Sequence, residues 1–330
     1  MILELIFGII DIGVDIMQDI KNDNLELFFD VLDESNNILY EVYHENYFNL
    51  LELTIKNILA SDIVCPIDDK ELEEKLKNVY KKLADVDFTV EDVRKALQAI
   101  ILRGFKETKM PNGNTTPDTL GIFFAYLITK LTNKKDISIL DPLCGTGNLL
   151  FTVGNHLDKN VTLLACDNDT LMTKLTKYSA DLMDVNVEIF LQDTLNLNIN
   201  NLDFIIFDMP HKEIKDNEYF PYKAFLKYKD MLAEDGAIIG IVENDFFNYD
   251  KDQEFKKKLL NDLSIVGMVE LPDEMFKAVK PKIIFILQKR KIDNKCFMVK
   301  LPSFTNVKEF NESLIDIENW FLKNNCKEEK

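Results

Sequence analysis

The sequence predicts an α/β protein in which a helical amino-terminal domain, residues 1–110, precedes a doubly wound sheet domain, residues 111–330. Apolar residues recur at helical spacing through residues 1–109, where no alternating strand pattern occurs. After residue 136, short apolar runs alternate with helical segments, as in a doubly wound sheet. A length of 330 residues is sufficient for a large α/β domain and a smaller one.

Three patterns predict the helices of the first domain. Ile2, Leu5, Ile6 and Ile9 would share one helical face. Asp68–Leu83 reads as a charged amphipathic helix with its leucines turned inward. Thr89–Glu91, just before Val93 and Leu97, is typical of a capped helix start. We therefore expect helices throughout this domain.

A linker rich in turn residues, Lys109–Pro117, separates the two domains and leads into a helix over Asp118–Leu131. The predicted strands of the second domain follow at short intervals, and a last strand with a terminal helix reaching Trp320 and Phe321 closes the chain. The strand runs are Ile137–Leu140, Thr162–Cys166, Glu188–Leu191, Asp203–Phe207, Ala237–Val242, Ile265–Glu270, Ile283–Gln288 and Phe297–Pro302.

The most informative stretch is Ile137–Leu150, which reads as a buried strand, a glycine loop and a helix start. The strand ends at Asp141-Pro142, because proline cannot donate to a sheet ladder. Gly145 and Gly147 permit a tight turn and close approach of a ligand, and Asn148 lies where the helix begins. The positive end of that helix suits a carboxylate or phosphate.

Neither common nucleotide fingerprint fits this loop. A dinucleotide site requires a third glycine where Leu150 stands, and Gly-Lys-Ser/Thr is absent. The sequence Asp-Pro-x-Cys-Gly-Thr-Gly-Asn instead resembles motif I of the class I S-adenosylmethionine (SAM)-dependent methyltransferases, in the form found in N6-adenine DNA methylases of type I restriction-modification systems. The alternative is a strand-to-helix turn that uses glycines for geometry alone. The resemblance implies a Rossmann-like, seven-stranded sheet with an antiparallel closing strand, and SAM as cofactor.

The resemblance also implies where SAM is bound. The Gly-x-x-Thr-Pro pattern at Gly113, Thr116 and Pro117 would touch its methionine end, although the same residues suit a plain helix cap. Acidic residues at strand ends would hold the nucleoside, or simply cap those ends: Asp167 the ribose hydroxyls and Asp193 the adenine amino group. The full set of implied cofactor-binding residues is Thr116, Pro117, Asp141, Pro142, Cys144, Gly145, Gly147, Asn148, Asp167, Asn168, Asp193 and Thr194.

The end of the fourth strand departs from the family pattern. N6-adenine methylases carry Asn/Asp-Pro-Pro-Tyr/Phe there, whose acceptors hold the amino group of a flipped adenine while the aromatic ring stacks on it. This chain has Asp208-Met209-Pro210-His211. The resemblance assigns Asp208, Pro210 and His211 to catalysis, with His211 as the stacking group. Alternatively, the motif has drifted. The substrate is then not adenine, or the protein binds SAM without methyl transfer and acts by docking a partner.

Further motifs narrow the resemblance. The Leu-Pro-x-x-x-Phe stretch at Leu271–Phe276, together with the Thr-Pro-Asp lead and the altered fourth-strand motif, is most similar to the YtxK-type family. The implied activity is methylation of an amino nitrogen, as in adenine of a nucleic acid.

The distribution of charge indicates which partners the protein could bind. The net charge is −18, and residues 1–62 hold 13 acidic and 2 basic side chains, which makes them a poor DNA-binding surface and either a solvated face or a docking patch for a protein. Lysines at 256–258, 277, 280, 282, 289 and 291, with Arg290, are candidates for a nucleic-acid groove, or are scattered cations in an acidic protein.

The scattered cysteines, and the lack of a signal peptide or a long apolar span, predict a reduced, cytoplasmic protein. No metal site is expected, because His44, His156 and His211 are far apart.

Overall fold

The computed structural model describes residues 23–111, 115–211, 219–276, 280–292 and 296–324. The chain forms two compact units. One contains the described residues between 20 and 115 together with Lys174–Val187, and the other contains those of 116–173 and 188–330. The predicted helical face at Ile2–Ile9 lies outside the described residues.

The first unit contains four helices in its 23–111 segment: α2 (Asp23–Tyr43), α3 (Tyr47–Ala60), α4 (Lys70–Lys81) and α5 (Val90–Glu107). The predicted amphipathic helix is α4, which starts after Asp69 because that carboxylate accepts the backbone N–H groups of Glu71 and Leu72. Thr89 and Asp92 form a reciprocal capping box at the start of α5, as the sequence predicted.

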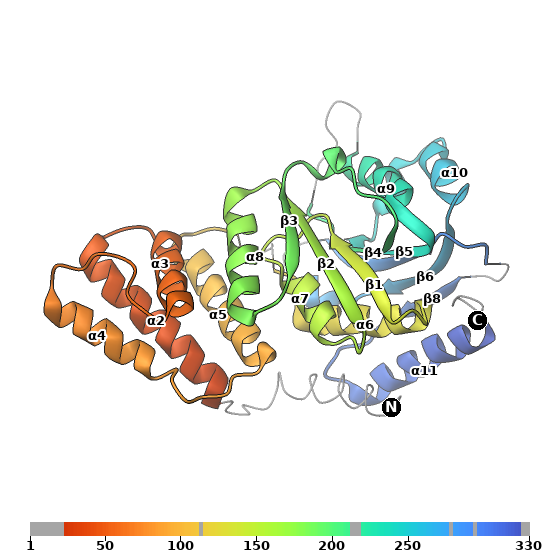
Figure 1. Ribbon diagram of the computed structural model, residues 1–330. Helices are drawn as coiled ribbons and strands as arrows, with labels where there is room; N and C mark the ends of the chain where they lie inside the picture. The colour runs from red at the N-terminus through yellow and green to blue at the C-terminus, as the bar shows by residue number, and fades with distance from the viewer. Residues whose placement is uncertain (1–22, 112–114, 212–218, 277–279, 293–295, 325–330) are drawn as a thin grey trace. The chain divides into compact units, whose positions relative to one another are not determined.

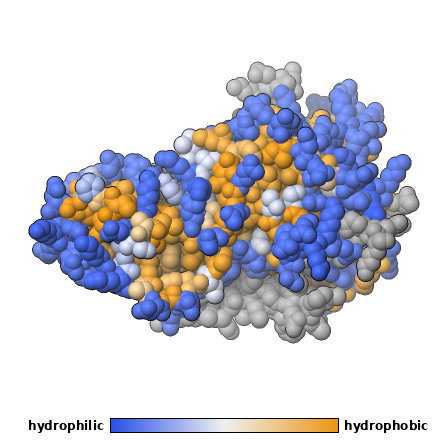
Figure 2. All heavy atoms as spheres, in the orientation of Figure 1, coloured by the Kyte–Doolittle hydropathy of each residue, from blue (hydrophilic) through white to orange (hydrophobic). Residues whose placement is uncertain are grey.

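The core of this unit is apolar with one buried polar network. Leu39, Leu50 and Leu76 pack together from three helices. Among them the Ser35 hydroxyl lies 2.8 Å from the Thr54 hydroxyl and 2.7 Å from that of Tyr80. The outer face of α4 is hydrophilic (Figure 2), because it carries lysines and glutamates. These side chains form ion pairs with one another at the surface. Helix α8 (Thr170–Met183) adds Lys174, which pairs with Glu52 of α3 at 3.3 Å.

The second unit is built on a sheet with eight strands in its described part, in the order β3-β2-β1-β4-β5-β7-β6-β8 (Figure 1). Strand β1 pairs in parallel with β2 and β4, and β4 with β5, whereas β7 runs antiparallel between β5 and β6. The predicted α/β fold and its antiparallel closing strand are confirmed. The strands are β1 (Asp136–Asp141), β2 (Asn160–Asp167), β3 (Val187–Leu191), β4 (Leu202–Asp208), β5 (Leu232–Glu243), β6 (Ser264–Glu270), β7 (Lys282–Gln288) and β8 (Phe297–Lys300).

The eighth strand extends the seven-stranded arrangement that the resemblance implied. The run at Phe297–Pro302 pairs in parallel with β6 and forms β8, and α11 follows it. The helices and 3₁₀ turns of this unit are α6 (Asp118–Leu131), α7 (Asn148–Asn155), η1 (Thr194–Asn196), α9 (Phe220–Met231), η2 (Phe246–Tyr249), α10 (Glu254–Leu260), η3 (Asp273–Phe276) and α11 (Val307–Lys323).

Aromatic residues fill the core beside β4, β5 and β7. Phe207, Phe225 and Phe246 are fully buried and lie edge to face or tilted against one another. Gly240 of β5 stands opposite Phe207 of β4 in the parallel register, and leaves room for the ring. None of the described helices combines the length and apolar character needed to cross a membrane.

We expect Gly240→Ala to destabilise the protein by about 1–3 kcal/mol, because the added methyl would overpack the core. An ideal Cβ at this position would lie 2.5 Å from two Phe207 ring atoms. Urea unfolding measures the effect. The penalty should shrink in a Phe207→Leu background, whereas Thr162→Ala at an exposed position of β2 should change stability by less than about 0.5 kcal/mol. A Gly240→Ala variant as stable as the parent chain would contradict this packing.

Candidate functional site

Three carboxylates lie at the carboxyl ends of the parallel strands. Asp141 ends β1, Asp167 ends β2 and Asp208 ends β4, and ligands of doubly wound sheets bind beyond this edge. The Asp167 carboxylate accepts the N–H of Gly145 at 2.9 Å with one oxygen and that of Asp169 at 2.9 Å with the other. The loop after β1 is thus fixed to the tip of β2.

The glycine loop adopts the conformation that the sequence predicted. Gly145 and Gly147 have φ angles of 53° and 79°, which L side chains rarely adopt, and Gly147 caps α7. The Cys144 N–H donates to the Cys166 carbonyl at 2.9 Å, and both cysteines are buried, as is Pro142. Burial, followed by the charge of Asp167, raises the pKa of Cys166 to about 12, so its thiol stays protonated at neutral pH.

Thr116 and Asn148 connect the start of α6 to the start of α7. The Asn148 amide donates to the Thr116 carbonyl at 2.8 Å and to the Asp118 carboxylate at 2.9 Å. The Thr116 hydroxyl donates to Asp208 at 3.3 Å, so the Thr-Pro segment reaches the tip of β4. Pro117 precedes α6 and is exposed. Gly113, the first residue of the predicted pattern, lies outside the described residues.

The residues assigned to the nucleoside end separate into two groups. Asn168 and Asp193 are exposed at the ends of β2 and β3, and Asp193 accepts the Leu195 N–H at 2.9 Å as the cap of η1. Thr194 is buried, with its hydroxyl 2.9 Å from that of the fully buried Tyr228. The Thr194 side chain therefore faces the protein core, while the side chains of Asn168 and Asp193 face solvent.

Charge repulsion acts on the most buried of the three carboxylates. Asp141 is 1% exposed, and its pKa is raised well above the ordinary value by burial and then by the charges of Asp167 and Asp208. The Leu143 N–H, which donates to Asp141 at 3.1 Å, opposes this rise only in part. The three carboxyl groups therefore interact electrostatically, and Asp141 holds its proton more tightly than an ordinary aspartate does.

Asp208 has two partners within the protein. Lys282, at the start of β7, lies 2.6 Å from one carboxylate oxygen, and Thr116 donates to the other. The Asp208 side chain is still 20% exposed. Of the rest of the motif, Met209 is buried and donates its N–H to the Ile241 carbonyl at 2.9 Å, whereas Pro210 is exposed.

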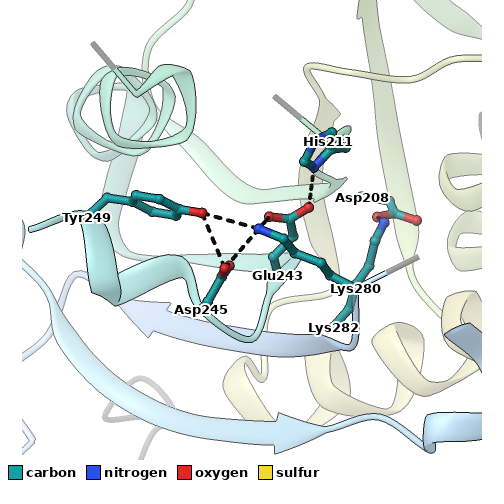
Figure 3. Close-up of polar contacts among 7 residues, drawn as sticks. All are labelled: Asp208, His211, Glu243, Asp245, Tyr249, Lys280 and Lys282. Atoms are coloured by element: carbon teal, nitrogen blue, oxygen red, sulfur yellow. Dashed lines mark hydrogen bonds and ion pairs between the residues drawn. The ribbon is translucent and has the colours of Figure 1, made fainter. Parts of the chain in front are cut away.

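His211 is paired with a carboxylate that the sequence analysis did not assign to the site. Its Nδ1 lies 2.5 Å from Glu243 at the end of β5, and Lys280 lies 3.3 Å from the same carboxylate (Figure 3). Lys280 also pairs with Asp245 at 2.8 Å and Tyr249 at 3.2 Å. Burial alone would raise the pKa of Asp245, but the hydrogen bond and charge of Lys280, together with the Tyr249 hydroxyl, outweigh it, and the pKa is lowered.

The strand pattern of the sequence could have assigned Glu243 and Lys282 to the site. Glu243 follows a predicted strand, in the same position as Asp141 and Asp167 on theirs. Because β7 is antiparallel, its first residue returns to the same edge, and Lys282 stands opposite Glu243 in the register. The pairing of His211 with Glu243 joins residues 32 positions apart, and no local pattern predicts it.

Several of the basic side chains considered for a nucleic-acid groove form ion pairs within the chain. Lys280 and Lys282 pair as described, Lys258 lies 3.6 Å from Glu254, and Arg290 lies 3.5 Å from Asp235. Lys277 lies outside the described residues. These pairs reduce the positive charge that is available to a phosphate backbone.

The residue set of this edge fits SAM. Its ammonium and sulfonium groups are cationic and suit an acidic edge, and its ribose offers two hydroxyl donors. Each oxygen of Asp167 accepts one backbone N–H and retains capacity for another donor. The left-handed glycines leave the loop without side chains where the backbone would approach the methionine part.

Solved structures of two methyltransferases have a similar fold. A candidate class I SAM-dependent methyltransferase from Listeria monocytogenes superposes with a TM-score of 0.81 at 29% identity, over 91% of this chain and 99% of that one. The methyltransferase subunit of a type I restriction-modification system from Streptococcus thermophilus gives a TM-score of 0.57 at 15% identity, over 83% and 71% of the two chains. The fold is thus that of the class I SAM-dependent methyltransferases.

The sequence comparisons define the family. Residues 99–321 match the N-6 DNA methylase model, and residues 26–105 match the YtxK N-terminal helical domain. The chain belongs to the N-6 DNA methylase family and carries a YtxK-like helical domain. An uncharacterized Bacillus subtilis protein, YtxK, is 40% identical over 144 residues, which cover 42% of this chain and 44% of that protein. The matched segment therefore spans less than half of the curated relative.

The raised pKa of Asp141 predicts a pH-dependent stability. The folded state holds the proton more tightly than the unfolded state, so this contribution is present below the ordinary value of 3.8 and is lost as pH rises through the raised value. Asp141→Asn keeps an acceptor for the Leu143 N–H and has no charge to bury. Its melting temperature should therefore rise relative to the parent chain as pH increases from about 4 to 8.

Asp136→Asn at the other end of β1 is the matched control. Asp136 is exposed and accepts a hydrogen bond from Asn160 that asparagine can also accept. This variant should follow the parent chain at every pH. Parallel melting curves for the parent and Asp141→Asn across the range would show that Asp141 carries no buried charge.

Proposed function

We propose that this protein transfers the methyl group of SAM to an amino nitrogen, and that the amino group of adenine in a nucleic acid is the substrate class. The observation that carries the proposal is the convergence of Asp141, Asp167 and Asp208 beside the glycine loop. Asp167 and Asp208 both contribute to the raised pKa of Asp141, so the three strand tips form one electrostatic site.

The proposed division of labour follows from the contacts. Asp167 would accept the ribose hydroxyls, and the Gly145–Gly147 loop and the Thr116–Pro117 segment would hold the methionine end. Asp193, which is exposed beyond β3, would accept the adenine amino group of the cofactor. When bound, SAM supplies an electrophilic methyl group, and the protein provides alignment and charge.

Asp208 would orient the nucleophile. Its carboxylate can accept about four hydrogen bonds and receives two in the described contacts, from Lys282 and Thr116. The remaining capacity suits an amino N–H, so that the nitrogen lone pair faces the methyl group. The Lys282 ammonium holds one oxygen of Asp208 in an ion pair of 2.6 Å. Alignment of this kind supplies a large share of the rate in bimolecular transfers.

A second candidate is a SAM-binding protein that has lost turnover and docks a partner through its acidic helical domain. One observation favours it, namely the 2.6 Å ion pair by which Lys282 occupies one oxygen of Asp208. This candidate predicts SAM binding without methyl transfer, and transfer that appears only after Lys282→Met. Measured transfer by the parent chain would exclude it.

Calorimetric titration with S-adenosylhomocysteine should give one site per chain, and NAD should give no heat. Asp167→Asn should weaken binding about tenfold or more, because a charged acceptor for two hydroxyls is lost. Asp184→Asn, at an exposed position with a left-handed φ of 53° that asparagine tolerates, is the control and should bind as the parent does. Equal affinities for the parent and Asp167→Asn would remove Asp167 from the site.

Label from methyl-tritiated SAM should enter DNA or RNA pools with the parent chain. Asp208→Ala should lower transfer by about 100-fold, since the nucleophile loses its acceptor, while S-adenosylhomocysteine still binds. Asp208→Asn retains one acceptor oxygen and should keep a larger fraction. Glu234→Gln, exposed on β5, is the control. Cofactor binding without any label in broad nucleic-acid pools would reject the proposed activity.

A further inference from the structure

We infer that His211 and Glu243 form a general-base pair, in which His211 takes the proton from the methylated nitrogen and Glu243 holds the ring in the required tautomer. The inference rests on the proposed methyl transfer and adds a proton acceptor to it. It starts from the contact between Nδ1 of His211 and the Glu243 carboxylate, 2.5 Å apart.

The chemistry of the two groups sets the tautomer. An ionised carboxylate can only accept a hydrogen bond, so Nδ1 of the neutral imidazole must carry the hydrogen. The lone pair is then on Nε2. The two side chains differ in exposure, because Glu243 is 10% exposed and His211 60% exposed. A buried carboxylate that orients an accessible imidazole is the arrangement by which hydrolase triads activate a histidine as a base.

Neighbouring charged groups hold the Glu243 carboxylate beside His211. Lys280 pairs with Glu243 and Asp245, and its position is supported by the Tyr249 hydroxyl. Lys282 pairs with Asp208 and not with Glu243 (Figure 3). The described groups that face the pair come from four places. They are Asp208 at the end of β4, Lys280 and Lys282 at the start of β7, Asp245 and Tyr249 after β5, and Tyr219 just before α9. Glu243 keeps a cationic partner on one oxygen and the His211 ring on the other.

The His211–Glu243 pair lies at the same edge of the sheet as Asp208, the proposed acceptor for the nucleophile. His211 follows Asp208 by three residues beyond the end of β4, and Glu243 ends the neighbouring strand β5. The ring thus stands at the same edge of the sheet as the proposed acceptor. The tyrosine or phenylalanine at this position of the family motif has no basic nitrogen, whereas an oriented imidazole can stack and can also accept a proton.

The step is balanced as follows. The substrate nitrogen forms a bond to the methyl carbon, and the carbon–sulfur bond breaks with its electron pair left on sulfur, which yields S-adenosylhomocysteine. The nitrogen then loses its proton to Nε2 of His211. Glu243 stabilises the resulting imidazolium, which returns the proton to water.

The first test needs no turnover. Histidine ¹⁵N shifts of the full-length chain, recorded above neutral pH, should show His211 as the Nδ1–H tautomer. Glu243→Met, which removes the acceptor, should shift His211 toward the Nε2–H form that predominates in free histidine. His156, whose Nδ1 lies 2.8 Å from the Thr152 carbonyl, should keep its signals in both proteins. A His211 ring that is Nε2–H in the parent chain would overturn the inference.

The second test follows methyl transfer against pH. Transfer by the parent chain should fall in acid, because a protonated imidazole has no lone pair with which to accept the proton. His211→Gln should lose that dependence, with a rate about 100-fold to 10,000-fold lower at its plateau. Glu243→Met should lower the rate while S-adenosylhomocysteine binding is unchanged, and His156→Gln should match the parent.

The outcomes separate the two proposals. If the parent chain transfers label and His211→Gln transfers it equally well with the same pH dependence, the general-base pair is wrong and the methyl transfer stands. If the parent chain transfers none, the proposed function itself is wrong.

Discussion

The site depends on one hydrogen bond, from the backbone N–H of Gly145 to the carboxylate of Asp167. It joins the loop after β1 to the end of β2, and it requires a left-handed residue with no side chain in the loop. A second link runs from Asn148 to the carbonyl of Thr116, so that the starts of two helices are held beside the same loop. These contacts place backbone atoms, and not bulky side chains, where a cofactor would approach.

Several carboxyl groups lie at the same edge of the sheet, and only some of them have a lysine partner. Asp141 has no cationic partner among the causes of its pKa shift and is instead raised by burial and by Asp167 and Asp208. Asp208 and Glu243 each have a lysine from the β7 side, Lys282 and Lys280. The β1 and β2 ends therefore favour a cation, whereas the β4 and β5 ends are nearly balanced. This difference suits the proposed reaction, in which a cationic cofactor lies on one side and a neutral amino nucleophile on the other.

The fold could be predicted from the sequence because its signals are local. Helix α6 begins and ends at the predicted residues, Asp118 and Leu131, and the strand-glycine-helix pattern located α7 at Asn148. The contacts of individual side chains could not be predicted in the same way. Thr194 follows a strand end like the other residues that were predicted to bind SAM. Its hydroxyl nevertheless faces Tyr228, because a buried phenol requires a hydrogen-bond partner. The contact of His211 with Glu243 depends on the order of β4 and β5 in the sheet.

A crystal structure of the protein with S-adenosylhomocysteine tests the central claim most directly, since the claim concerns where a nucleoside lies. The account predicts difference density across the ends of β1, β2 and β3, with the ribose hydroxyls within hydrogen-bond distance of Asp167 and the amino-acid end against Gly145 and Gly147. Density at any other place on the sheet unit, or a Gly145–Asp167 bond that leaves no room for the ribose, would contradict it.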